Sequence, residues 1–368
     1  GITFGCLKFI PTKFLLTRVC RELKNSSYSM NSFFLRISAI TFAATALLTS
    51  CRLHEKIILD NSVPQELGLN LVKVTDETKN SVISNKYLNY TKSLPSNGYA
   101  GCSKLAWDTG ARLCISPDGK ELAYLSYVDK APNIMVRSSQ PNSTSSQRTF
   151  RRVQTISWAA DGNLYFNDNS DNKSTICSTD AHSGNLVKQI TSNNNDWSPS
   201  VSDDGKMLYF TRYDNVGPYI WAINLDSGEL LSCTRGYNAV TMRNSPMKIL
   251  CTRNSAKGNS EIWMIDLQKG DETLLLTDAE KGFSDPVVSP DGKWVLVVGS
   301  SLSNISGRYN TDIYAVRTDG TQLTQITHHP EVDNSPAWSP DGKFIYFISS
   351  RGNKERRFNI WRINNPLF

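Results

Sequence analysis

The chain has 368 residues and a formal net charge of +6 at pH 7. Residues 1–50 hold six Lys or Arg and a single Glu, so the rest of the chain carries a net charge of only +1. This near neutrality gives no support to a general nucleic-acid-binding protein or to a protein that acts on acidic substrates.

The first fifty residues change in character at Met30. Residues 1–29 hold scattered Lys and Arg without a strand pattern, and we interpret them as an upstream extension outside the mature protein. In residues 30–50, a head with one positive charge precedes an uncharged run of apolar or small residues and a small-residue end. This order predicts a signal peptide, because the apolar core is too short to span a membrane as a mature helix.

Cys51 directly follows the apolar run, in the sequence Leu48-Thr49-Ser50-Cys51. This tetrad resembles the lipobox of bacterial lipoproteins, in which the Cys becomes the first mature residue and its thiol carries diacylglycerol. We therefore predict lipidation at Cys51, since two or three acyl chains anchor a protein stably. Arg52 follows instead of Asp, which by resemblance to Gram-negative sorting favours the outer membrane. The alternative is an ordinary signal peptide in which Cys51 is accidental.

Residues 51–104 are polar and mixed in composition. This stretch is too short for an independent domain of ordinary size. We interpret it as a tether that also contains a strand, because Leu69 to Thr75 has the apolar and Thr pattern of strands found later in the chain. Tyr87 to Thr91 is the reserve candidate for that strand.

A five-residue phrase recurs along the remaining chain. Ser-Pro-Asp-Gly-Lys stands at 116–120, 289–293 and 339–343, with degenerate copies at 159–163 and 202–206. Each copy predicts a hairpin, because an Asp-Gly pair between two apolar runs adopts the positive φ of a tight turn at little cost. The long gap before 289–293 leaves room for another unit, and residues 244–253 fill it with Ser-Pro and a strand but without Asp-Gly.

A second marker gives the same count of six units. In each unit, an Ile lies in the second strand after the turn. These positions are Ile134-Met135, Ile176-Cys177, Ile220-Trp221, Ile262-Trp263, Ile313-Tyr314 and Ile360-Trp361. Each period of about 40 to 45 residues holds four short strands, which is the size of a propeller blade. Residues 105–368 are therefore predicted to form an all-β, six-bladed β-propeller of four-stranded antiparallel blades. A β-sandwich with similarly spaced hairpins is the alternative.

The last predicted blade lacks its outer strand, because the sequence stops soon after Ile360-Trp361. An N-terminal strand should close the ring and cover the open edge. Leu69 to Thr75 is the first candidate, since it is similar to the outer strands around Leu186 to Thr191 and Leu323 to Thr327.

These repeats resemble those of the TolB propeller family. The resemblance rests on the Ser-Pro-Asp-Gly-Lys turn, on the preceding Ser198-Pro199, Asp285-Pro286 and Ser335-Pro336, and on the Ile-Trp or Ile-Tyr strands. It implies a periplasmic protein that acts with the peptidoglycan-associated lipoprotein and the Tol envelope complex. Two departures stand against an identical role: about fifty residues occupy the place of an α/β domain, and a lipobox replaces an ordinary signal.

One polar position recurs at the start of the inner strand in every unit. Counting back from the Ser of each turn gives Arg112, Thr155, Ser198, Thr241, Asp285 and Ser335. Inner-strand starts surround one mouth of a propeller channel, so we predict that these side chains bind a partner there. Alternatively, polar residues simply suit a junction between loop and strand.

Catalytic patterns are missing from the sequence. Of its four His, His328 and His329 are neighbours, and no set of His from several units can assemble as in metal-dependent propeller lyases. No nucleophile elbow or phosphate-binding Gly-rich loop occurs. We therefore predict neither enzyme activity nor a metal or cofactor, but a monomeric, lipid-anchored module that binds an envelope protein and no nucleic acid. The alternatives are a propeller enzyme acting on envelope glycan or peptide, and a surface adhesion scaffold.

Overall fold

The computed structural model describes residues 68–76, 82–84, 110–128, 131–170, 173–184, 187–256, 259–302, 309–352 and 357–367. The chain separates into two units, Gly1–Leu59 and Asp60–Phe368, and every described residue belongs to the second. The predicted extension, the signal peptide and Cys51 lie outside the described residues. Nowhere in the described part is there a helix long and apolar enough to cross a membrane.

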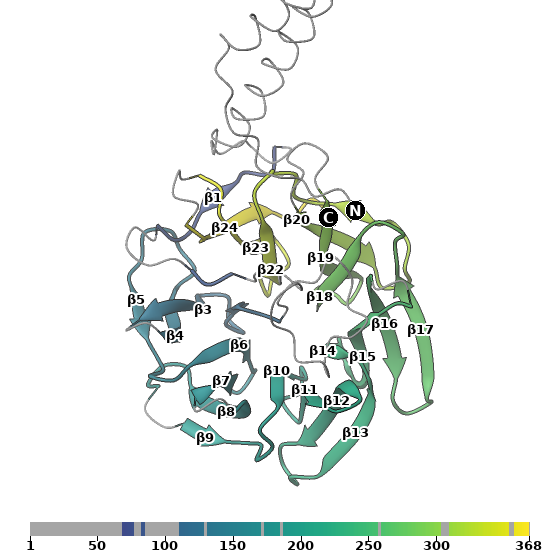
Figure 1. The fold of residues 1–368 in the computed structure, drawn as a ribbon. Coiled ribbons are helices and arrows are strands. Elements are labelled where there is room, and N and C mark those ends of the chain that lie inside the picture. Colours follow the sequence, from purple (N-terminus) through teal and green to yellow (C-terminus); the bar gives the residue numbers. More distant parts are fainter. Residues whose placement is uncertain are drawn as a thin grey trace, which may run out of the picture. The chain divides into compact units, whose positions relative to one another are not determined.

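Six four-stranded antiparallel sheets form the blades of a ring, which confirms the predicted six-bladed propeller (Figure 1). Each blade runs outward from an inner strand beside the axis, in the order in which its strands follow along the chain. The last blade differs, because its outer strand comes from the N-terminal part of the chain.

The strands are as follows. The first three blades contain β2 (Leu113–Ile115), β3 (Glu121–Val128), β4 (Ala131–Ser138), β5 (Ser145–Gln147); β6 (Val153–Trp158), β7 (Asn163–Asp168), β8 (Thr175–Asp180), β9 (Val187–Gln189); β10 (Asp196–Val201), β11 (Met207–Asp214), β12 (Gly217–Asn224) and β13 (Leu230–Arg235). The last three contain β14 (Tyr237–Met242), β15 (Ser245–Asn254), β16 (Ser260–Asp266), β17 (Asp271–Leu276); β18 (Gly282–Val288), β19 (Trp294–Leu302), β20 (Tyr309–Arg317), β21 (Thr324–Gln325); β22 (Asp333–Trp338), β23 (Phe344–Ser349), β24 (Asn359–Asn364) and β1 (Val72–Lys73).

The repeated phrase forms the turn between the first and second strands of a blade. In blade five, the Ser289 hydroxyl donates to Asp291 Oδ1 at 2.6 Å and accepts the Trp294 N–H at 2.9 Å. Gly292 has φ +71°, a value that L side chains rarely adopt. The turns that begin at Ser116, Ser202 and Ser339 repeat these bonds. Short-range hydrogen bonds therefore fix each hairpin from within its own blade.

The Ile of the second marker lies in the third strand of each blade and is fully buried in all six. Stacking of blade on blade buries it, because a single sheet cannot cover both of its faces. Its backbone N–H is bonded to a Thr hydroxyl near the outer strand, at 3.0 Å in blades one, two and five.

The N-terminal strand β1 completes blade six. It pairs antiparallel with β24, which confirms the first candidate, Leu69 to Thr75. Thr75 takes the position of the outer-strand Thr: its hydroxyl accepts the Ile360 N–H at 2.9 Å and donates to Asn359 Oδ1 at 3.0 Å. The reserve candidate, Tyr87 to Thr91, lies outside the described residues.

A second N-terminal stretch, residues 82–84, lies between blade six and blade one. The Val82 N–H donates to the Phe358 carbonyl at 3.1 Å, and the Ile83 N–H donates to the Leu125 carbonyl at 2.8 Å. Both side chains are buried and pack in the cores beside blade one. The ring is therefore closed at two points, one at an outer edge and one between blades.

Blade four departs from the repeat. Only Arg243 and Asn244 join β14 to β15, and Asn244 adopts φ +55°. Ser245 is exposed and lies in the strand, so it is not the counterpart of Ser289. Arg243 instead reaches its neighbours: its Nε donates to the Ser289 carbonyl at 3.2 Å, and its guanidinium pairs with Asp203. The turn of blade four thus connects blades three, four and five.

Candidate functional site

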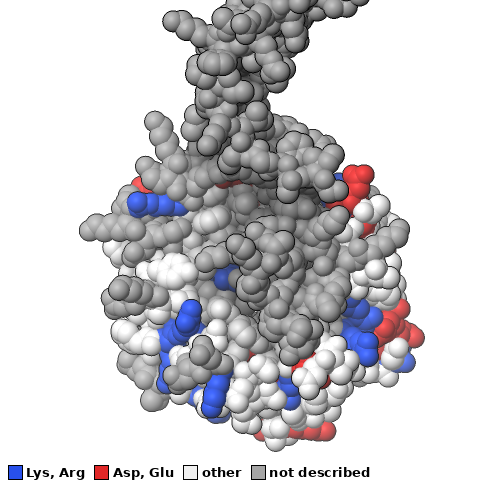
Figure 2. Space-filling model, viewed as in Figure 1, with Lys and Arg blue, Asp and Glu red and all other residues white. Residues whose placement is uncertain are grey.

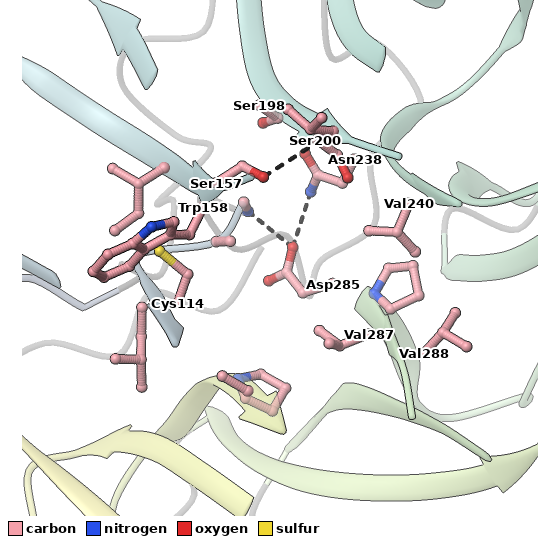
Figure 3. Close-up of a pocket in the computed structure, with 18 of the residues that line it drawn as sticks. Cys114, Ser157, Trp158, Ser198, Ser200, Asn238, Val240, Asp285, Val287 and Val288 are labelled. Atoms are coloured by element: carbon pink, nitrogen blue, oxygen red, sulfur yellow. Dashed lines mark hydrogen bonds between the residues drawn. The ribbon is translucent and has the colours of Figure 1, made fainter. Parts of the chain in front are cut away.

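A cavity of about 250 Å³ lies on the axis of the ring and is lined by the inner strands of all six blades (Figure 3). Its walls combine apolar and polar side chains, with Val240, Val287 and Val288 on one side and Trp158 near Cys114 on the other. Polar side chains stand at its mouth, where the inner strands begin. A concave site in which apolar walls and convergent polar groups meet is a candidate ligand-binding pocket.

Four residues at the mouth share an unusual backbone conformation. Ser198, Asn238, Asp285 and Ser335 have φ between +49° and +52°, and each lies within a break in the pairing register. The left-handed conformation costs an ordinary residue about 1–2 kcal/mol, so the surrounding bulges must hold it. These bulges turn the four residues toward the axis, where all of them line the cavity.

The register of blade four corrects one predicted position. Val240 pairs with Leu250 as Ser200 pairs with Tyr209, so the counterpart of Ser198 in blade four is Asn238. Thr241, which the sequence spacing indicated, lies three residues farther along the strand and also lines the cavity. The spacing was misleading because it was counted from Ser245, which is not a turn residue in this blade.

The remaining two predicted residues lie behind the cavity wall. Arg112 and Thr155 are both buried and are not among the residues that line the cavity. Thr155 supports the mouth from behind, since its hydroxyl donates to Asn167 Oδ1 at 2.6 Å and accepts the Ser198 N–H at 3.2 Å. The structure therefore places Ser198, Thr241, Asp285 and Ser335 on the cavity, and Arg112 and Thr155 beside it.

Asp285 is the centre of the polar contacts at the mouth. Its Oδ1 accepts the side-chain N–H of Asn238 at 2.9 Å and the backbone N–H of Gly110 at 2.8 Å (Figure 3). Gly110 directly precedes the first blade, whereas Asp285 belongs to the fifth. This contact was not predicted, because nothing in the sequence links two positions 175 residues apart.

The dipeptide Gly110–Ala111 is held in the mouth by its main chain. Besides the contact of Gly110 with Asp285, the Ala111 carbonyl accepts the Ile156 N–H at 2.9 Å. Gly110 has φ +112°, and a Cβ there would lie 2.5 Å from Thr155 Cγ2 and 3.0 Å from Ser198 Oγ. A residue larger than Gly does not fit, so the mouth binds this peptide unit closely.

The cavity shows no activated nucleophile. Burial raises the pKa of the Cys114 thiol well above its ordinary value of 9.0, so the thiol stays protonated at neutral pH. Ser157 Oγ accepts the Val201 N–H at 3.5 Å, and the Trp338 indole donates to the Val287 carbonyl at 3.1 Å. Across the described part of the chain, no three His, Cys, Asp or Glu side chains come together as a metal site.

The structure is thus a six-bladed β-propeller with an axial cavity. Residues 113–304, just over half of the chain, match the TolB beta propeller domain family. The chain belongs to this family.

Two solved structures share the fold. TolB from Acinetobacter baumannii has a TM-score of 0.52 and 20% identity, covering 62% of this chain and 56% of that chain. A putative TolB from Agrobacterium tumefaciens has a TM-score of 0.52 and 19% identity, covering 70% of this chain and 90% of that chain. At these identities the likeness concerns the architecture.

A curated relative is similar over a shorter stretch. The uncharacterized peptidase YuxL of Bacillus subtilis is 33% identical over 98 residues, which are 26% of this chain and 14% of that protein. The chain therefore spans a small part of this relative.

Proposed function

We propose that this protein is a non-enzymatic binding module of the bacterial cell envelope, which holds a segment of another protein at the mouth of its channel. Membership of the TolB propeller family and the axial cavity support this role. The chemistry of the mouth favours a polypeptide as the ligand.

The observation that carries the proposal is the capture of Gly110–Ala111. A carboxylate accepts one peptide N–H and a strand N–H donates to the next carbonyl, so the mouth already binds a peptide unit by its main chain. A partner segment that extends or displaces this dipeptide finds the same donor and acceptor. Ser198 and Ser335 offer hydroxyls beside them on the cavity wall.

The proposed partner is an envelope protein similar to the peptidoglycan-associated lipoprotein. The carboxylate of Asp285 would hold an N-terminus or a basic side chain of the bound segment. In this proposal residues 30–50 are a signal peptide, Cys51 carries the lipid, residues 51–104 form the tether and closing segment, and residues 105–368 form a propeller that faces the periplasm from the outer membrane.

The site is tested with Asp285→Asn, which removes the charge but keeps an acceptor for the Gly110 N–H. We expect calorimetry with the periplasmic domain of a peptidoglycan-associated lipoprotein to show affinity weakened about tenfold or more, as at an interface hot spot. Asp319→Asn is the matched control, since Asp319 is exposed in the turn before β21 and bonds within that turn. Equal affinity for the wild type and Asp285→Asn would refute the site.

The anchor is tested separately by mass spectrometry of the protein purified from bacterial membranes. A diacylglyceryl group on an N-terminal Cys51, absent in Cys51→Ala, is the expected result. An unmodified chain that begins elsewhere would refute the lipid anchor and leave a periplasmic propeller without a tether.

A further inference from the structure

Exposed apolar and basic side chains gather around blade two, on the same face as the channel mouth. Phe150 is 88% exposed and Val216 is 77% exposed, which is unusual for residues of these types. Arg152 and Lys173 are exposed between them. Figure 2 shows blue side chains over the part of this face where Figure 1 places β4 to β8. We name Phe150, Arg152, Lys173 and Val216 the blade-two rim.

Backbone hydrogen bonds link the loops that carry these residues. The Arg152 carbonyl accepts the Asn169 N–H at 2.7 Å, which links the loop of Phe150 to the loop after β7. Beyond Lys173, the Ser174 N–H donates to the Asn194 carbonyl at 2.8 Å. The next residue, Asn195, accepts the Tyr213 N–H at 3.0 Å, close to the turn of Val216. The loops of blades two and three that carry the rim are therefore linked by main-chain hydrogen bonds.

The charges of the rim are of two kinds. Asp168 and Asp196 are buried and paired with Arg151 and Arg212, at 2.9 Å and 2.7 Å, so these pairs are internally neutral. Arg152 and Lys173, by contrast, form no ion pair within the described part of the chain. Among the described residues of this edge, Asp214 is the exposed acid, and it accepts the N–H groups of Val216 and Gly217. Among the described exposed residues of this edge, the two unpaired positive charges of Arg152 and Lys173 therefore outnumber the negative charge of Asp214.

We infer that the blade-two rim binds an acidic protein segment that carries apolar side chains. The inference deepens the proposed function: the mouth holds the main chain of the partner, and the rim selects a neighbouring stretch by its composition. Carboxylates of the partner pair with Arg152 and Lys173, while an aromatic or aliphatic side chain packs on Phe150. Exposed apolar surface mixed with Arg is typical of protein interfaces.

The probe is a fluorescein-labelled peptide that contains Glu and Phe, compared with its counterpart in which Gln replaces Glu. Fluorescence anisotropy is measured with the full chain in detergent, at low and high salt. We expect the Glu peptide to bind and to weaken with salt, because exposed ion pairs are screened. Phe150→Ser and the double variant Arg152→Glu, Lys173→Glu should each weaken binding about tenfold.

Leu323→Ser and Lys269→Glu are the matched controls, since both residues are exposed but lie in blades five and four, away from the rim. Neither should change the affinity for the peptide. Equal binding of the Glu and Gln peptides, or rim variants that bind like the wild type, would overturn the inference. Polygalacturonate that competes equally well, with no effect of Phe150→Ser, would also overturn it, by indicating an anionic glycan.

The two proposals fail in distinguishable ways. If Asp285→Asn weakens binding of the lipoprotein domain while the rim variants do not, the mouth stands and the rim inference is refuted. If the rim variants lose the Glu peptide while Asp285→Asn leaves lipoprotein binding unchanged, the rim binds acidic segments without the proposed mouth.

Discussion

The turns between the first two strands of blades four and five are stabilised in different ways. In blade five, Ser289, Asp291 and Gly292 close the hairpin by contacts within the six residues from Ser289 to Trp294. In blade four, Arg243 and Asn244 make a shorter turn without a carboxylate, and the Arg243 side chain bonds to blades three and five. One turn stabilises its own blade, whereas the other contributes to the cohesion of the ring.

The comparison shows that a degenerate repeat is not a weakened one. Loss of Asp-Gly removed the local hydrogen bonds of the turn, but it freed the position for a long side chain that spans two blade boundaries. Because Gly292 lies against Arg243, the two turns also depend on each other.

The largest effect is expected where the two turns touch. Gly292→Ala places a Cβ at positive φ and 3.3 Å from Arg243 Cβ, and we expect a loss of about 3 kcal/mol in the free energy of unfolding. Gly205→Ala has the same φ of +71° but open space around the new methyl, so about 1–2 kcal/mol should be lost. Urea denaturation measures both losses. Equal losses would show that the Arg243 side chain can shift away from the new methyl group at no cost in free energy.

The Ser of the Ser-Pro phrase should contribute more to the free energy of unfolding in blade five than in blade four. Ser289→Ala leaves the buried Trp294 N–H without its acceptor, for an expected loss of about 2 kcal/mol. Ser245→Ala alters an exposed strand residue and should stay within about 0.5 kcal/mol. The same denaturation series compares them, and a large effect at Ser245 would contradict the register assigned to blade four.

Arg243→Ala should cost about 1 kcal/mol, because the lost bonds are partly exposed. Its specific signature is faster hydrogen exchange at the facing ends of blades three and five, where Asp203 and Ser289 lie. Arg235→Ala, at an exposed Arg whose side chain has no partner among the described residues, is the control. Unchanged exchange would mean that the guanidinium does not join the blades.

The smallest effect concerns pH. The Ser339 hydroxyl holds the pKa of Asp341 below its ordinary value of 3.8, so this carboxylate stabilises the fold above that value. The stabilisation is lost as pH falls below 3.8 toward the depressed pKa of the folded state. Thermal unfolding between pH about 6 and about 3 should show a flatter profile for Ser339→Ala than for the wild type. Parallel profiles would argue against the hydrogen bond.

Much of this fold depends on local sequence. The Asp-Gly turns and the buried Ile of the third strand depend on neighbours a few residues away, so their repetition predicted six blades and the strand at Leu69 to Thr75. Blade four was misaligned because Ser245 kept the phrase while the turn had shortened.

The site was less predictable, because its contacts join distant parts of the chain. Spacing indicated the position of Asp285, yet its partner Gly110 comes from a segment without any repeat. The bulges that turn Ser198 and Asn238 to the axis depend on pairing between strands, which composition does not specify. Phe150 and Arg152 lie in a loop, and only the folded surface shows that they are exposed together with Lys173.

Closure of the ring by β1 has a mechanical consequence. Tension along the chain upstream of Gly68 reaches the propeller through the Leu69 carbonyl, bonded to the Asn364 N–H at 2.8 Å, and then through the two-residue pairing with β24. No other blade bears this load, since all the others are built from continuous chain. Force applied upstream of Gly68 would therefore peel β1 from β24 and expose the outer edge of blade six, while residues 82–84 still join blades six and one.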